Sequence, residues 1–97
     1  MKPREQVAWF AERMEAKLQK NDYKGEWESF SYLMDRLEEE SEKLITFTVK
    51  LRTEDFIGNK PSGALIARVI DEASDVANSA MMIADRARKL RDEISKR

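Results

Sequence analysis

The stretch that decides the fold is residues 64–94, ALIARVIDEASDVANSAMMIADRARKLRDEI. Its apolar residues recur at spacings of three and four, which is the period of an α-helix. They are Leu65, Val69, Ala73, Val76, Ala80, Ile83, Ala87 and Leu90. Many side chains along this stretch are small, so a neighbouring helix axis can approach closely. The pattern predicts a long helix from about Ala64 to near Ile94, which Ser62 can cap and whose charged end frays.

Working outward toward the N-terminus, the same period predicts two further helices. The second runs from about Ser29 to Leu51 and carries an apolar arc wide enough to meet more than one neighbour. That arc contains Phe30, Leu33, Met34, Leu37, Leu44, Ile45, Phe47, Val49 and Leu51. The first helix begins near Pro3, because proline is favoured at the first helical position, and ends near Asn21. Its stripe is Val7, Phe10, Met14 and Leu18.

Length and composition limit the class of protein. With 97 residues, we expect a single domain covering residues 1–97. The absence of both Cys and His excludes disulfides, thiolate zinc sites and imidazole bases. A net charge of −1 argues against nucleic-acid binding through bulk charge. We see no apolar leader and no membrane-length apolar run, so a cytoplasmic protein without a membrane partner is the expectation.

The predicted fold class is an all-α bundle of about three helices per chain. A chain this short, with such broad apolar faces and no disulfides, leaves apolar surface uncovered when it stands alone. We therefore expect homo-oligomerisation to complete the bundle. The oligomer is a homodimer or a homotetramer that pairs the second and third helices.

Acidic residues gather at two places on these helices. One cluster covers residues 38–42 and the other residues 71–75; in each, two acids stand three apart, Glu39 with Glu42 and Glu72 with Asp75. Side chains three apart share a helix face, so facing pairs would bring carboxylates together. Hard oxygen ligands suit Mg²⁺ or Mn²⁺. The same spacing is also common on ordinary solvated helices, and that alternative stays open.

A helical wheel separates these acids by position. Glu40 falls inside the edge of the apolar arc, and Glu72 borders the stripe of its own helix. Asp75 sits one step further out, whereas Glu39 and Glu42 point toward the polar side. A buried carboxylate is costly unless it is paired or bound to a cation, so Glu40 and Glu72 are the most informative acids.

The order ExxE, loop, ExxD resembles the MazG-like all-α nucleoside triphosphate pyrophosphohydrolases. Residues 10–18 (FAERMEAKL), residues 21–25 (NDYKG) with Trp27, and residues 75–85 (DVANSAMMIAD) are similar to a small phage-type subgroup described as dATP/dGTP diphosphohydrolase. The resemblance implies Mg²⁺-dependent hydrolysis of dGTP or dATP to the monophosphate and pyrophosphate. Some members of the subgroup serve phage nucleotide pools or 2-aminoadenine metabolism.

The resemblance also implies roles for individual residues. The implied catalytic carboxylates are Glu39, Glu40, Glu72 and Asp75, all metal ligands, with Glu42 as a further metal ligand. The implied substrate contacts are Lys17, Asn21, Lys24, Trp27 and Asn78. Four of the five also have an ordinary structural explanation: Lys17 and Lys24 as surface lysines, Asn21 as a helix stop and Trp27 as a tryptophan that caps the core.

One position departs from the subgroup pattern. Aligned on Leu44, the third acid of the first motif is replaced by Lys43, and the adjacent pair is Glu39-Glu40. Aligned on spacing, Glu39 and Glu42 form the ExxE. Glu26 likewise replaces an expected Gly. Two alternative functions therefore stand beside the enzyme: a non-catalytic helical interaction module, and a catalytically weakened nucleotide binder.

Overall fold

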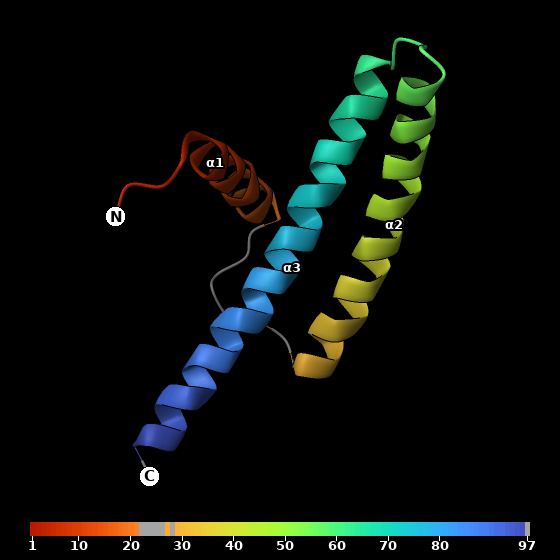
Figure 1. Cartoon of the computed structure of the whole chain (residues 1–97). Coiled ribbons are helices and arrows are strands. Elements are labelled where there is room, and N and C mark those ends of the chain that lie inside the picture. The colour runs from red at the N-terminus through yellow and green to blue at the C-terminus, as the bar shows by residue number, and fades with distance from the viewer. Residues whose placement is uncertain (22–26, 28, 97) are drawn as a thin grey trace.

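The computed structural model describes residues 1–21, 27 and 29–96. It contains three helices, α1 (Glu5–Lys20), α2 (Phe30–Phe56) and α3 (Gly63–Ser95) (Figure 1). The described residues include no β-strand. The all-α prediction is therefore confirmed, and the three predicted helices are all present.

Helices α2 and α3 form an antiparallel hairpin along most of their length (Figure 1). Ser29 and Ser62 cap them: the Ser29 hydroxyl accepts from the backbone N–H of Tyr32 at 3.3 Å, and that of Ser62 from Leu65 at 3.1 Å. The predicted end of α2 at Leu51 is wrong, because the helix continues to Phe56. Residues 52–56 include no Gly or Pro that would break a helix, and Gly58, with φ at 77°, turns the chain just beyond it.

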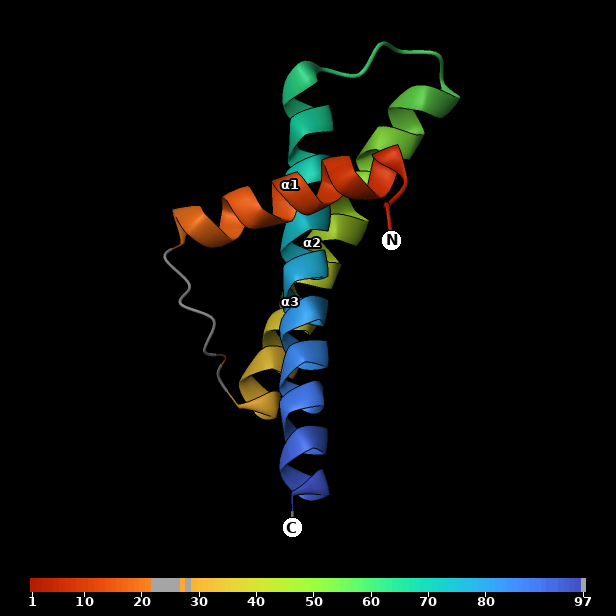
Figure 2. The ribbon, with the colours of Figure 1, turned by 90° about the vertical axis from the view of Figure 1, so that its left-hand side faces the viewer.

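Helix α1 lies across α3 (Figure 2). Of the two other helices, it packs only against α3. It begins at Glu5, so the prediction that Pro3 occupies the first helical position is wrong. The first helical hydrogen bond runs from Ala8 N to Arg4 O at 2.9 Å, which makes Arg4 the N-cap. None of the α1 residues is fully buried. This helix is therefore held to the hairpin by a small number of contacts.

The core of the single chain is thin. Among the described residues, only Leu33 and Met82 are fully buried apolar side chains. The Cα radius of gyration is 16.3 Å, whereas a compact chain of 100 residues has about 13 Å. The molecule is accordingly elongated, with extents of 59 × 32 × 23 Å.

Apolar side chains that would belong to a core instead face outward. On α2, Met34, Ile45 and Val49 are exposed, and Ile45 and Val49 line a shallow hollow together with Leu44. On α1, the exposed Val7 and Trp9 flank a second apolar hollow. The sequence therefore supplies more apolar surface than one chain covers. None of the described helices combines the length and apolarity needed to cross a membrane.

Candidate metal centre

Three carboxylates meet between α2 and α3, near the middle of the hairpin. They belong to Glu40 on α2 and to Glu72 and Asp75 on α3. One oxygen from each lies within 4.8 Å of the others. The two α3 acids share a face because they stand three residues apart. The antiparallel pairing of the helices brings Glu40 to the same point.

Glu72 is the most deeply buried member, with 3% of its surface exposed. Its Oε1 lies 2.9 Å from Arg68 Nε, one turn earlier on α3. Its Oε2 is buried and has no hydrogen-bond partner among the described residues. A buried carboxylate oxygen without a donor or cation is costly. The set of three hard oxygen donors with one unpartnered atom therefore fits a divalent cation such as Mg²⁺ or Mn²⁺.

The electrostatics of Glu40 reflect its place beside the other two acids. Burial raises the pKa of the Glu40 carboxyl above its ordinary value, and repulsion from Asp75 and then Glu72 adds to the rise. The nearby cations Lys43 and Arg36 act in the opposite direction but do not cancel it. Glu40 therefore holds its negative charge less readily than an isolated glutamate does. A cation at this point would stabilise that charge.

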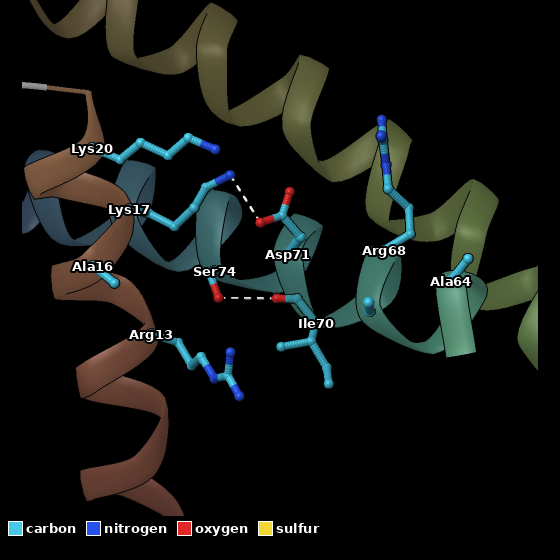
Figure 3. Close-up of a pocket in the computed structure, with 10 residues that line it drawn as sticks. Arg13, Ala16, Lys17, Lys20, Ala64, Arg68, Ile70, Asp71 and Ser74 are labelled. Carbon is cyan, nitrogen blue, oxygen red and sulfur yellow. Dashed lines mark hydrogen bonds and ion pairs between the residues drawn. The ribbon is translucent and has the colours of Figure 1, made fainter. Parts of the chain in front are cut away.

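A lysine from the crossing helix touches the outer side of the cluster. Lys17 Nζ lies 3.0 Å from Asp71 Oδ1 and 3.2 Å from Asp75 Oδ1 (the Asp71 contact is drawn in Figure 3). Burial alone would lower the pKa of the Lys17 ammonium, but the hydrogen bonds to Asp71 and Asp75 outweigh that effect and raise it. Lys17 therefore stays charged, joins α1 to α3 and neutralises part of the cluster.

The chain does not bring Glu39 and Glu42 to this point. Both are exposed, and neither belongs to the group of mutually close carboxylates found in the described part of the chain. Glu39 instead pairs with Lys43 at 3.4 Å along the outer face of α2. The wheel positions agree with the observed burial, because Glu40 and Glu72 turn inward while Glu39 and Glu42 face solvent.

The predicted substrate contacts have different surroundings. Asn78 is buried; its Nδ2 donates to the Met14 backbone carbonyl at 3.1 Å, and its Oδ1 has no hydrogen-bond partner in the described chain. Trp27 Nε1 donates to Asp85 Oδ2 at 2.7 Å, which fastens the residue to α3. Asn21 is exposed and forms the C-cap of α1. Lys24 lies outside the described residues.

Three residues that contact the predicted site residues were not themselves predicted as site residues. Asp71 shares the Lys17 ammonium, Arg68 holds Glu72, and Asp85 accepts from Trp27 while pairing with Lys89 at 3.1 Å. Arg68 could have been found, because a basic residue four positions before an acid is a typical helical ion pair. The other two depend on contacts between segments far apart in the sequence.

Comparison with protein-family models, with curated proteins and with solved structures gives no match for this chain. The geometry of the carboxylate cluster and its surroundings is therefore the basis on which a function can be assigned.

Proposed function

We propose that this protein is a metal-dependent nucleoside triphosphate pyrophosphohydrolase that acts on a purine deoxynucleoside triphosphate, dGTP or dATP. The observation that supports this most directly is the buried, unpartnered Oε2 of Glu72 beside the carboxylates of Glu40 and Asp75. Such a group of oxygens is able to hold a divalent cation, and a divalent cation is what binds the phosphates of a nucleotide. The resemblance of the sequence to MazG-like enzymes supports the reaction type and the purine preference.

The residues of this chain would act together on the metal and its ligands. Glu40, Glu72 and Asp75 would hold Mg²⁺ or Mn²⁺. When bound, such an ion neutralises phosphate charge and lowers the pKa of a water molecule. Arg68 fixes the orientation of the Glu72 carboxylate through its contact with Oε1. Lys17 does the same for Asp75 from α1.

The remaining predicted contacts are assigned to the nucleoside. Asn78 has a buried carbonyl oxygen free to accept, one helical turn after Asp75, so we assign it to the sugar or the base. We assign Trp27 to the base and Asn21 and Lys24 to the substrate on the resemblance alone. Glu39 and Glu42 receive no ligand role within one chain, because both face solvent.

We also propose that the chain functions as a homodimer or homotetramer. The thin core and the exposed Ile45 and Val49 of α2 support this, because a second copy would cover them. A non-catalytic helical interaction module is the second candidate. The same exposed faces favour it, and so does Lys17, which already supplies a cation to the cluster.

The proposal is tested by turnover. We expect incubation with each deoxynucleoside triphosphate and Mg²⁺ to convert dGTP or dATP to the monophosphate and pyrophosphate, resolved by chromatography. Glu72→Gln and Asp75→Asn should each remove most of the activity, since a neutral amide keeps the shape but loses the charge that holds the metal. Glu42→Gln, on the exposed face of α2, is the matched control and should keep it.

Two results would contradict the assignment. Release of orthophosphate instead of pyrophosphate would reject the reaction type. Full turnover by Glu72→Gln would reject the site. Metal binding by the wild type without turnover of any deoxynucleotide would favour the weakened nucleotide binder, and an absence of metal binding would favour the interaction module.

A further inference from the structure

A cleft of about 550 Å³ lies between α1 and α3, on the side of the carboxylate cluster where Lys17 enters. Helix α1 supplies three basic side chains to it, from Arg13, Lys17 and Lys20. Their spacing of four and then three residues places them on one face of the helix. Figure 3 shows all three extending from α1 toward α3. The cleft therefore has a basic wall made by a single helix.

The described acidic residues near the cleft do not neutralise all of this charge. Among the described residues, Asp71 is the only acidic one that lines the cleft, and it pairs with Lys17. Arg68, which also lines the cleft, pairs with Glu72. Lys20 and Arg13 have no acidic partner among the described residues; the Arg13 guanidinium instead lies 5.5 Å from the centre of the Trp9 ring. Two cations in the cleft are thus available to an anionic ligand.

The spacing of these cations indicates the size of the anion. From Arg13 to Lys20 the helix rises by roughly 10 Å, at about 1.5 Å per residue. A single small anion would contact only one end of this row, whereas a chain of phosphate groups can contact both. Arginine binds phosphate oxygens through its planar fork and lysine through a point charge. The cleft therefore suits a polyphosphate better than a lone carboxylate or phosphate.

The cleft is connected to the carboxylate cluster by two ion pairs. Lys17 reaches Asp75 at 3.2 Å, and Arg68 reaches Glu72 at 2.9 Å. A phosphate chain along α1 would thus lie beside the acids that would hold a metal. We propose that this cleft binds a polyphosphate, either the phosphate chain of a nucleoside triphosphate or the pyrophosphate released from it, through Arg13 and Lys20. The catalytic role of this binding rests on the proposed function; the binding itself does not.

Binding is tested with the full chain and inorganic pyrophosphate or tripolyphosphate, in the absence of divalent ions, by titration calorimetry. We expect the Arg13→Gln/Lys20→Gln double variant to bind at least about tenfold more weakly, because two charge-assisted contacts are lost. Lys96→Gln removes the same type of charge at the far end of α3 and should bind like the wild type. Equal affinity of the double variant and Lys96→Gln would overturn the proposal, provided circular dichroism shows both folded.

The same variants separate this proposal from the assigned reaction. Glu72→Gln should lose turnover yet keep metal-free pyrophosphate binding. A wild type that binds pyrophosphate through Arg13 and Lys20 but hydrolyses no nucleotide would support the cleft and reject the enzyme. In an active protein, a raised KM for dGTP with unchanged kcat in the double variant identifies the triphosphate as the ligand. Weaker inhibition by pyrophosphate with an unchanged KM identifies the product.

Discussion

At the scale of single residues, Glu40 connects the sequence pattern to the chemistry of the cluster. It stands between Glu39 and Ser41 in an acidic run, yet it alone of residues 38–40 turns toward α3. Its raised pKa follows first from burial and then from the neighbouring Asp75 and Glu72. In the absence of a cation, this charge therefore costs stability at neutral pH, since the folded state holds the charged form less favourably than the unfolded chain does.

The first prediction is that Glu40→Gln raises the melting temperature of the metal-free protein at pH 7 by a few degrees. The sign depends on pH. Because the folded pKa of Glu40 lies above the unfolded one, the wild type gains stability relative to the variant as pH falls through the folded pKa. The advantage of Glu40→Gln should therefore shrink below that pKa. Thermal melts at several pH values, with the exposed Glu42→Gln as control, check both statements; a destabilised Glu40→Gln at pH 7 would contradict them.

A second prediction concerns metal binding to Glu40, Glu72 and Asp75. A ligand that binds only the folded state adds about 2.7 kcal/mol of stability at a hundredfold excess over its Kd. We expect millimolar Mg²⁺ or Mn²⁺ to raise the melting temperature, and NaCl of equal ionic strength to have no such effect. Glu72→Gln should abolish the rise, and a flat response of the wild type would favour an ordinary solvated acidic face. The effect should weaken as pH falls, because Glu40 then takes up a proton instead of a metal.

At the scale of elements, α1 differs from the other two helices. It has no fully buried residue, and the described polar contacts that hold it to α3 are the Lys17 ion pairs and the hydrogen bond from Asn78 to the Met14 carbonyl. Two of the three residues of the cluster come from α3, to which α1 is tied through Lys17. The position of α1 and the charge of the cluster are therefore coupled.

The third prediction follows from this coupling. Lys17→Gln should weaken the attachment of α1 by about 1 kcal/mol, the scale of a partly exposed ion pair. Hydrogen exchange of the α1 backbone amides should then be about fivefold faster, while the exchange of α2 stays unchanged. Lys20→Gln, which breaks no ion pair to Asp71 or Asp75, is the matched control. Equal protection of α1 in the two variants would show that Lys17 does not hold the helix.

At the scale of the whole molecule, the distribution of apolar surface is the dominant feature. Only Leu33 and Met82 are fully buried apolar side chains in the described part of the chain, while Met34, Ile45 and Val49 are exposed along α2. An uncovered face of this kind is typical of a surface that packs against another chain. The elongated shape of the hairpin makes a long face available for such packing.

The fourth prediction is a dimer or tetramer in solution. Light scattering at micromolar concentration should give a mass that is a multiple of 11.3 kDa. Ile45→Asp should shift the protein toward the monomer, because a charge placed in the hollow beside Val49 would be desolvated at the interface. Thr46→Asp places the same charge on the adjacent exposed position of α2, outside that hollow, and should leave the mass unchanged. A wild-type mass near that of one chain would reject the proposed assembly.

Local sequence determined the helices, because their formation depends on interactions between residues a few positions apart. The apolar spacing in residues 64–94 predicted α3, Ser62 predicted its cap, and the wheel placed Glu40 and Glu72 on inward faces. Helix ends were less well predicted: α1 starts after Pro3, and α2 continues beyond Leu51. Terminal turns are set by weak capping preferences that a few neighbouring contacts can outweigh.

Only the tertiary structure decided which distant side chains meet. The regular pair Glu39 and Glu42 suggested ligands by spacing, yet the facing of α2 and α3 selects Glu40 to join Glu72 and Asp75. The contact of Lys17 with Asp71 and Asp75 depends on how α1 crosses α3, which no periodicity encodes. Helical period fixes the direction of a side chain around its own axis. The crossing of two helices depends on packing between whole faces, and it is that crossing which assembles the carboxylates and the basic cleft.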